Sequence, residues 1–231
     1  MRNHNKSRNK VASKKLAPPN YLIICEGKET EPNYFNGLKQ KINEKFGDRI
    51  SIVPAIKIKG TGLNTESLIK YTKQYINKSP KVYGQVWVVF DKDDYSDEQF
   101  DNAIKLNEYN SAWSNPNFEI WLLSHFKKIT APISKNNTLR ELKKEFQNAS
   151  LGNYSKNDKE IFEKVTKDNR LESAIKNCKE LYEEFNYVFS NANKNPCTTV
   201  FMLVEDLSEY LKWKDDSIEK KTKKRSNTFS K

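Results

Sequence analysis

The sequence predicts an α/β fold with a small, mostly parallel sheet flanked by helices, followed by a helical C-terminal extension. Short and almost uniformly apolar runs occur at Tyr21–Cys25 and at Val86–Phe90. Such runs are typical of strands that are covered by helices on both faces. Segments with helical spacing stand between the apolar runs, so strands alternate with helices as in βαβ units. After about residue 138 only helical patterns remain.

The elements expected in the first 133 residues follow from apolar spacing and from residues that favour helix starts or turns. Thr30 is suited to cap a helix whose first turn holds Pro32. Pro54 indicates that its strand lies at a sheet edge or contains a bulge. The expected order is strand 21–25, helix 30–46, strand 50–58, helix 65–76, strand 86–90, helix 97–107, a short strand within 109–114 and helix 118–123.

The C-terminal region is expected to be helical throughout, with no strand. Asn195 and Pro196, together with Thr198, are suited to open the last helix. The expected helices cover about 138–147, 158–168, 170–188 and 198–213. The chain is therefore expected to comprise a disordered basic arm (1–19), an α/β domain (20–133), a helical region packed on it (134–213) and a disordered basic tail (214–231).

The positive charge of the chain is concentrated at its two ends. The 231 residues carry 41 Lys and Arg against 30 Asp and Glu, a formal net charge of +11. Residues 1–15 contain six cations and no acid, and residues 212–231 carry a net charge of +5, so the body between them is neutral. Basic tails suit a polyanion such as nucleic acid, with Lys14 and Lys15 as expected contacts. The alternative is coding bias, because Lys and Asn abound and Arg is rare.

Several classes of protein are excluded by composition. No run of 18 apolar residues occurs, so a membrane span is not expected. The N-terminus is polar and basic rather than a secretory signal, which favours a cytoplasmic protein. The three cysteines, Cys25, Cys178 and Cys197, are far apart and predict neither a disulfide framework nor a zinc ribbon.

Acidic residues gather where the two apolar strands end. Glu26 follows the first strand, with Glu31 close behind, and Asp91, Asp93 and Asp94 follow the strand at 86–90. The carboxyl ends of parallel strands share one edge of a sheet, which is where ligands bind in open α/β folds. Alternation along an extended chain puts Asp91 and Asp93 on one side. Carboxylate oxygens are the ligands that Mg²⁺ accepts, so the pattern predicts a Mg²⁺ site.

The residues around these strand ends also have other interpretations. Asp is an ordinary turn residue, so an acidic loop after a strand also has a purely structural explanation. Gly27 allows a sharp turn and the approach of a substrate. No GxxxxGK[ST] motif occurs, and the loop at Gly60 and Gly62 lacks the third glycine of a dinucleotide fingerprint. His125, which closes an apolar helix, is expected to be packed rather than catalytic.

Four segments resemble the motifs of the RloB-like family, in the family's order. The first motif includes Glu26 and Gly27, the second ends in the acidic run from Asp91, and the third surrounds Asn117. The matching segments are 24–35, 86–94, 114–126 and 195–205. This resemblance implies a Toprim-like fold, as in topoisomerases, primases and overcoming-lysogenization-defect nucleases.

The resemblance also implies a site and a biological setting. The Toprim pattern of a Glu and a later Asp-x-Asp falls on Glu26, Asp91 and Asp93. The implied setting is prokaryotic anti-phage defence, beside restriction–modification genes and an AAA- or ABC-type ATPase partner. Lys92 stands where the family more usually has Arg, and Asn117 stands where it often has Cys, so no thiol chemistry is expected there.

The resulting hypothesis is a Mg²⁺-dependent (or Mn²⁺-dependent) phosphodiesterase that cleaves DNA or RNA. Glu26 is expected to act as general base or ligand, and Asp91 and Asp93 as metal ligands. Glu31 and Asp94 are further expected ligands.

Cationic residues complete the expected site. Lys156 lies in a Tyr-x-Lys that resembles a recurrent family feature and is the candidate catalytic cation, although a solvated lysine would fit the sequence as well. Lys28 and Lys92 are expected nucleic-acid contacts. Glu119 could either reach the site or cap its own turn.

The rival hypothesis is a non-catalytic Toprim-like adaptor that docks an ATPase or senses nucleic acid. Phosphoacceptor chemistry of the receiver type is disfavoured because no later strand followed by a lysine was found. The sequence does not decide the oligomeric state, and self-association is left open.

Overall fold

The computed structural model describes residues 20–46, 56–93 and 95–212. The expected arm and tail, including Lys14 and Lys15, lie outside the described residues. So do Asp94 and the first part of the strand expected over 50–58.

A five-stranded sheet forms the centre of the described chain, with strand order β2-β1-β3-β4-β5. The first four strands are parallel, and β5 is antiparallel to β4. The strands are β1 (Tyr21–Cys25), β2 (Ile56–Gly60), β3 (Gln85–Asp91), β4 (Asn110–Asn115) and β5 (Cys197–Thr198). The mixed α/β architecture with a mostly parallel sheet is therefore confirmed, and it is consistent with the Toprim-like fold that the resemblance implies.

The expectation that no strand follows residue 138 is wrong. Thr198 pairs with Ser114 and Cys197 pairs with Asn115, which adds β5 to the sheet. Two residues are too short to show an alternating pattern, and only the partner strand identifies them. The last helix accordingly begins at Val200 rather than at residue 198.

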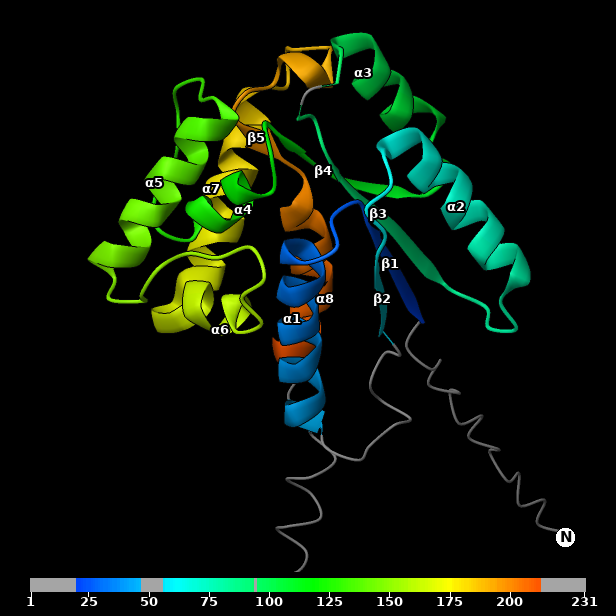
Figure 1. Cartoon of the computed structure of the whole chain (residues 1–231), viewed down its shortest axis with the longest axis horizontal. Helices are drawn as coiled ribbons and strands as arrows, with labels where there is room; N and C mark the ends of the chain where they lie inside the picture. Colours follow the sequence, from blue (N-terminus) through cyan, green and yellow to red (C-terminus); the bar gives the residue numbers. More distant parts are fainter. Residues whose placement is uncertain (1–19, 47–55, 94, 213–231) are drawn as a thin grey trace, which may run out of the picture.

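Helices cover both faces of the sheet, as Figure 1 shows. Alternation along β1 turns Tyr21, Ile23 and Cys25 to one face and Leu22 and Ile24 to the other. The first face is covered by α1 (Thr30–Phe46), α4 (Glu119–Ser124), α5 (Lys135–Asn148), α6 (Ile161–Thr166), α7 (Arg170–Glu184) and α8 (Val200–Lys212), and the second by α2 (Thr65–Lys78) and α3 (Asp97–Leu106).

The C-terminal helices share the core of the sheet. Phe146 of α5, Phe162 of α6 and Val204 of α8 belong to the same buried cluster as Ile23 of β1. Each side chain of this size stabilises the fold by about 1.5–3 kcal/mol through its burial. The helical region therefore continues one face of the sheet. None of the helices that the structure describes is long and apolar enough to cross a bilayer.

Local contacts explain where several helices begin and end. Asn64 caps α2 by accepting from the backbone N–H of Ser67, and a capping box of Ser96 and Gln99 opens α3. Thr30 was expected to cap α1, but its hydroxyl instead donates to the backbone carbonyl of Lys156 at 3.1 Å. This bond ties the loop that contains Lys156 to the start of α1.

Candidate functional site

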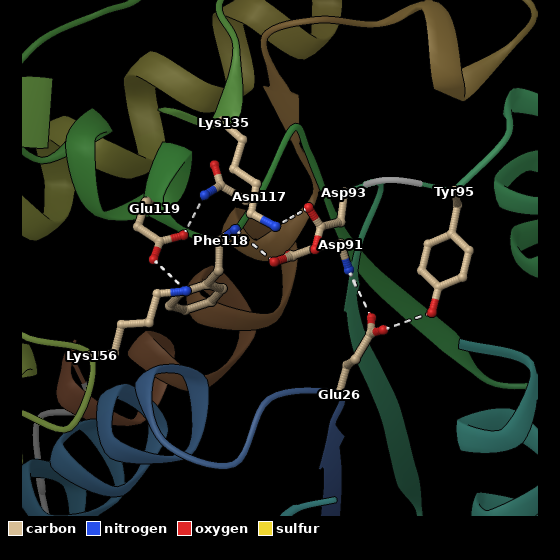
Figure 2. A network of polar contacts seen from close by, with 9 residues as sticks. All are labelled: Glu26, Asp91, Asp93, Tyr95, Asn117, Phe118, Glu119, Lys135 and Lys156. Atoms are coloured by element: carbon tan, nitrogen blue, oxygen red, sulfur yellow. Dashed lines mark hydrogen bonds and ion pairs between the residues drawn. The ribbon is translucent and has the colours of Figure 1, made fainter. Parts of the chain in front are cut away.

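Glu26 leaves the end of β1 at the carboxyl edge of the sheet, and three groups hold its carboxylate. Oε2 accepts the backbone N–H of Asp91 at 3.2 Å and the hydroxyl of Thr65 at 3.4 Å. Oε1 accepts the hydroxyl of Tyr95 at 3.1 Å (Figure 2). Parallel pairing of β1 with β3 places Glu26 and Asp91 at the same edge. The Glu26 carboxylate is therefore fixed by contacts from β3, the turn after β3 and the start of α2.

Asp91 is the last residue of β3, on the face that also carries Trp87 and Val89. Its Oδ2 accepts the backbone N–H of Phe118 at 3.0 Å (Figure 2). Its Oδ1 is buried and has no hydrogen-bond partner among the described residues. Buried polar atoms are nearly always paired, so this carboxylate oxygen is open to a bound ion or water.

Glu31 enters the site because Gly27 leaves room for it. The Glu31 side chain is buried, with a residue exposure of 6%. A Cβ atom on Gly27 would lie 2.2 Å from Oε2 of Glu31, which is impossible without a displacement. Gly27 was expected to serve a sharp turn and an approaching substrate, and the structure gives its missing side chain this further role.

Glu119, whose position the sequence left open, reaches the site. It is buried, and Oε2 accepts the amide of Asn117 at 2.5 Å. Oε1 accepts the hydroxyl of Tyr154 at 3.0 Å. The same oxygen lies 3.5 Å from Nζ of Lys156 (Figure 2). The loop that carries Tyr154 and Lys156 thus meets the start of α4 at the site.

Glu26, Glu31, Asp91 and Glu119 are here called the carboxylate cluster, and its negative charges raise the pKa values of Asp91 and Glu31. Burial raises the pKa of Asp91 well above its ordinary value, and the charges of Glu31 and Glu119 raise it further. Burial, followed by the charges of Glu119 and Glu26, raises the pKa of Glu31 to about 7. Burial also raises the pKa of Glu26. The site therefore concentrates negative charge that a bound cation would neutralise.

Asp93 lies at the outer border of the site, here called the rim, and pairs with a lysine. Its carboxylate is paired with Lys135 in the first turn of α5 (Figure 2). The backbone at Asp93 has φ 39°, outside the extended region. The expectation that Asp91 and Asp93 face the same side assumed extended backbone, and in the structure their carboxylates have different partners.

The lysines expected at the site differ in their exposure to solvent and in their ion pairs. Lys156 has a side chain 59% exposed and lies beside Glu119. Lys28 is exposed, and its stem passes close to Gly62. Lys92 is only 13% exposed and is paired with Asp97 at 3.1 Å, so it stabilises the turn after β3. Its contact with nucleic acid stays a prediction.

A polar hollow of about 610 Å³ opens beside the rim. It lies between the turn after β3 and the start of α5, and four charged residues line it: Lys92, Asp93, Asp97 and Lys135. The carboxylate cluster is therefore bordered by a space that a substrate could enter.

The comparison with protein families gives one match, to the RloB-like protein family over residues 21–207. The chain belongs to the RloB-like protein family. The matched range includes all five described strands and the whole carboxylate cluster. Searches of curated proteins and of solved structures found no match.

The residues of this RloB-like chain fit a hard divalent cation in their donor chemistry. Carboxylate oxygens are the donors that Mg²⁺ prefers, and Oδ1 of Asp91 is unpartnered among the described residues. In the part of the chain that the structure describes, however, no three His, Cys, Asp or Glu side chains form a ready metal-binding group. A cation would have to draw the carboxylates together.

The sequence did not reveal several residues of the RloB-like site. Thr65, Tyr95 and Lys135 contact Glu26 or Asp93 from three different elements. None of them belongs to a motif, and each is brought in by the tertiary fold. Ser134, which caps α5, would have been the available signal for Lys135, because it moves the helix start to residue 135.

Proposed function

We propose that this RloB-like protein is a Mg²⁺-dependent (or Mn²⁺-dependent) phosphodiesterase that cleaves DNA or RNA. One observation carries the proposal: Asp91 ends a central strand with a buried, unpartnered carboxylate oxygen among three other carboxylates. A structural ion pair would explain a buried carboxylate, but no cation pairs with Asp91 among the described residues. The Toprim pattern on Glu26, Asp91 and Asp93 further supports the proposal.

Each carboxylate has a distinct role in this proposal. Asp91 and Glu31, both deeply buried, would hold the cation from inside the cluster. Glu26 is oriented by Tyr95 and Thr65, which suits a ligand or a base that accepts a proton from water. Asp93, at the rim beside the polar hollow, would have to leave Lys135 to become a ligand.

Two cations at the rim would complete the site. When bound, Mg²⁺ neutralises charge at the phosphate and activates water. Lys156 beside Glu119 and Lys135 beside Asp93 would attract the phosphate and oppose the negative charge of its transition state. Asn117 and Tyr154 hold the carboxylate of Glu119 toward Lys156.

Cleavage assays with a matched variant test this function. Wild type and Asp91→Asn are incubated with plasmid, single-stranded DNA and tRNA in Mg²⁺ or Mn²⁺. We expect cleavage by the wild type and a loss of at least about a hundredfold in Asp91→Asn. Asp206→Asn is the control, because Asp206 accepts from Tyr21 at the opposite end of β1, and it should retain activity. Equal cleavage by wild type and Asp91→Asn would refute the role of the cluster.

Calorimetric titration with Mg²⁺ separates the enzyme from the non-catalytic adaptor. The enzyme requires binding that Asp91→Asn abolishes and Asp206→Asn preserves. An adaptor with a vestigial site would show no such binding and no cleavage.

The biological setting and the partner are part of the proposal. The family resemblance supports a role in anti-phage defence together with an AAA- or ABC-type ATPase. If the wild type binds Mg²⁺ at Asp91 without cleaving any substrate, an AAA- or ABC-type ATPase from a neighbouring gene should be added to the same assay. Cleavage that appears only with the ATPase would identify it as the activator.

A further inference from the structure

A row of three tyrosines lies on the surface at the β2 edge of the sheet, outside the carboxylate cluster. The rings of Tyr71 and Tyr75 on α2 are stacked, with centroids 6.1 Å apart and planes 27° apart. Tyr83, which precedes β3, continues the row with its centroid 6.5 Å from that of Tyr75. All three residues are partly exposed, and they pack against the apolar core of the α2–α3 face. The row is therefore a supported aromatic surface that solvent can reach.

Lysines accompany the row. Lys59 donates to the hydroxyl of Tyr71 at 2.9 Å, and its Nζ lies 4.3 Å from the ring centroid of Tyr75. Two hollows of about 330 and 390 Å³ meet at Tyr75. Four more lysines, and no carboxylate among the described residues, line these hollows: Lys39, Lys57, Lys78 and Lys81. We call these five lysines with Tyr71, Tyr75 and Tyr83 the tyrosine–lysine row.

The charge of the row is not balanced locally. Elsewhere on the body, lysines such as Lys73 and Lys128 are paired with glutamates. None of the five lysines of the row forms an ion pair with a described residue. Lysines on an edge strand prevent pairing with other sheets, which would explain Lys57 and Lys59 on β2. It would not explain Lys78 on α2, the other lysines or the tyrosines.

The row leads toward the carboxylate cluster. Tyr83 lies before the start of β3, whereas Tyr71 contacts Lys59 near the end of β2. The loop after β2 then returns to the site, because the N–H of Gly62 donates to the backbone carbonyl of Glu26 at 2.7 Å. Lys28 stands beside Gly62. A chain bound along the row would thus reach Glu26 by way of Lys28.

We propose that the tyrosine–lysine row binds single-stranded nucleic acid, with bases stacked on the tyrosine rings and phosphates held by the lysines. Aromatic rings bind any base by stacking, and lysines bind the backbone, so the surface suits a strand without a required sequence. Base faces are available for stacking in a single strand and are covered in a duplex. The inference rests on the proposed function only for its nucleic-acid substrate, because binding along the row needs no metal.

Fluorescence anisotropy with the full chain in EDTA tests the binding. The probes are labelled oligonucleotides of about 12 nucleotides, oligo(dT) and oligo(U), with a duplex of the same length for comparison. We expect a single strand to bind at least about tenfold more tightly than the duplex. Whichever of oligo(dT) and oligo(U) binds more tightly shows whether the row prefers DNA or RNA.

Two sets of variants locate the binding. Tyr75→Leu keeps an apolar side chain against the core but removes the aromatic face, and it should weaken binding about tenfold. Lys57→Gln with Lys81→Gln should reduce the slope of log affinity against log salt by about 1.4. The control is Tyr187→Leu with Lys176→Gln, which changes two well-exposed residues of the same types elsewhere and should leave binding unchanged.

The outcomes decide the proposal. An unchanged affinity in Tyr75→Leu, an equal affinity for the duplex or the absence of binding by the wild type would overturn it. A row that instead contacts a protein partner would give the last of these results. Circular dichroism verifies that each variant is folded.

Failure of the row and failure of the proposed function give different results. Asp91→Asn should bind the oligonucleotides in EDTA as the wild type does, because the row lies outside the cluster. If the protein binds single strands but cleaves none of the substrates under any condition, the binding role of the row is supported and the proposed nuclease activity is refuted. If Tyr75→Leu cleaves as the wild type does at every substrate concentration, the nuclease activity is supported and the binding role of the row is refuted.

Discussion

Burial acts in opposite directions on the acids and on the buried histidine of this chain. It raises the pKa values of Asp91 and Glu31, where further negative charges add to the effect. It lowers the pKa of His125 to about 4, because the charged form loses its water. The negative charges of the acids repel one another, whereas both ring nitrogens of His125 have hydrogen-bond partners. That difference assigns the acids to a candidate site and His125 to the core.

The contacts of His125 show how the core holds it neutral. Nδ1 lies 3.0 Å from the carbonyl of Trp121, which can only accept, so Nδ1 carries the proton. Nε2 then accepts the hydroxyl of Tyr34 at 3.3 Å. A second proton on Nε2 would reverse this hydrogen bond, with the hydroxyl of Tyr34 then accepting, and would place a charge in an apolar cluster. His125 is therefore packed, as the sequence predicted.

The contribution of His125 to the stability of the folded protein should become unfavourable in acid. The unfolded chain has a histidine pKa of about 6.5 and takes up a proton that the folded chain refuses down to about pH 4. Between pH 7.5 and 4.5 this effect should cost about 2 to 3 kcal/mol. Urea unfolding of wild type and His125→Gln across this range measures it as the difference in pH slope.

The comparison of variants is needed because the raised pKa values of Glu26, Glu31 and Asp91 affect stability in the opposite direction. A folded acid that binds protons more readily than the unfolded chain gains stability as the pH falls. His4→Gln changes the chain's other histidine and should keep the wild-type slope. The interpretation of His125 is wrong if His125→Gln also keeps that slope.

At the scale of elements, the sequence was sufficient for the central strands. Tyr21–Cys25 and Gln85–Asp91 lie in the middle of the sheet and are apolar on both faces, which makes them visible as continuous runs. Because parallel strands end at one edge, their following acids Glu26 and Asp91 could be placed together without a structure. That step found half of the carboxylate cluster from two strand ends.

What the sequence missed depends on contacts between distant segments. Strand β5 exists only through its pairing with β4, and the place of Glu119 depends on Tyr154 and Lys156 from another loop. Such contacts carry no local periodicity. They are fixed by packing, which a reading of spacing along the chain does not include.

Beyond the end of β5, a side chain rather than a strand backbone accepts a hydrogen bond from β4. Thr199 follows β5 and is buried, and its hydroxyl accepts the backbone N–H of Trp113 at 2.9 Å. Thr199→Val should therefore leave a buried N–H without a partner and cost about 1–3 kcal/mol. Urea unfolding of the variant measures this loss.

Thr72→Val provides the matched control for Thr199. Thr72 is also buried, but its hydroxyl only donates to the carbonyl of Leu68 within α2. No backbone N–H depends on it, so Thr72→Val should cost less than Thr199→Val. Equal losses would mean that the size and polarity of the side chain matter and that the bond to Trp113 does not.

For the whole molecule, the distribution of charge sets a problem that the tails could solve. The net charge of +11 resides in residues 1–15 and 212–231, while the body is neutral and gathers carboxylates at one edge. Without a cation, that edge repels phosphate. The tyrosine–lysine row attracts phosphate at the β2 edge of the body. The tails would add an attraction that acts over a distance and is screened by salt.

Neutralising the basic arm should therefore weaken nucleic-acid binding mainly at low salt. Replacing the six cations of residues 1–15 with Gln lowers the formal net charge from +11 to +5. Anisotropy across a salt series should show a lower affinity and a shallower salt slope, because fewer counterions are released. Cleavage of a short substrate at saturating concentration should persist, since the carboxylate cluster is unchanged. The matched control removes the same charge from the described body, at Lys143, Lys144, Lys159, Lys167, Lys176 and Lys179. An equal effect of both variants would mean that the attraction depends on net charge alone. If the arm variant has no effect, its cations are explained by coding bias and not by nucleic-acid binding.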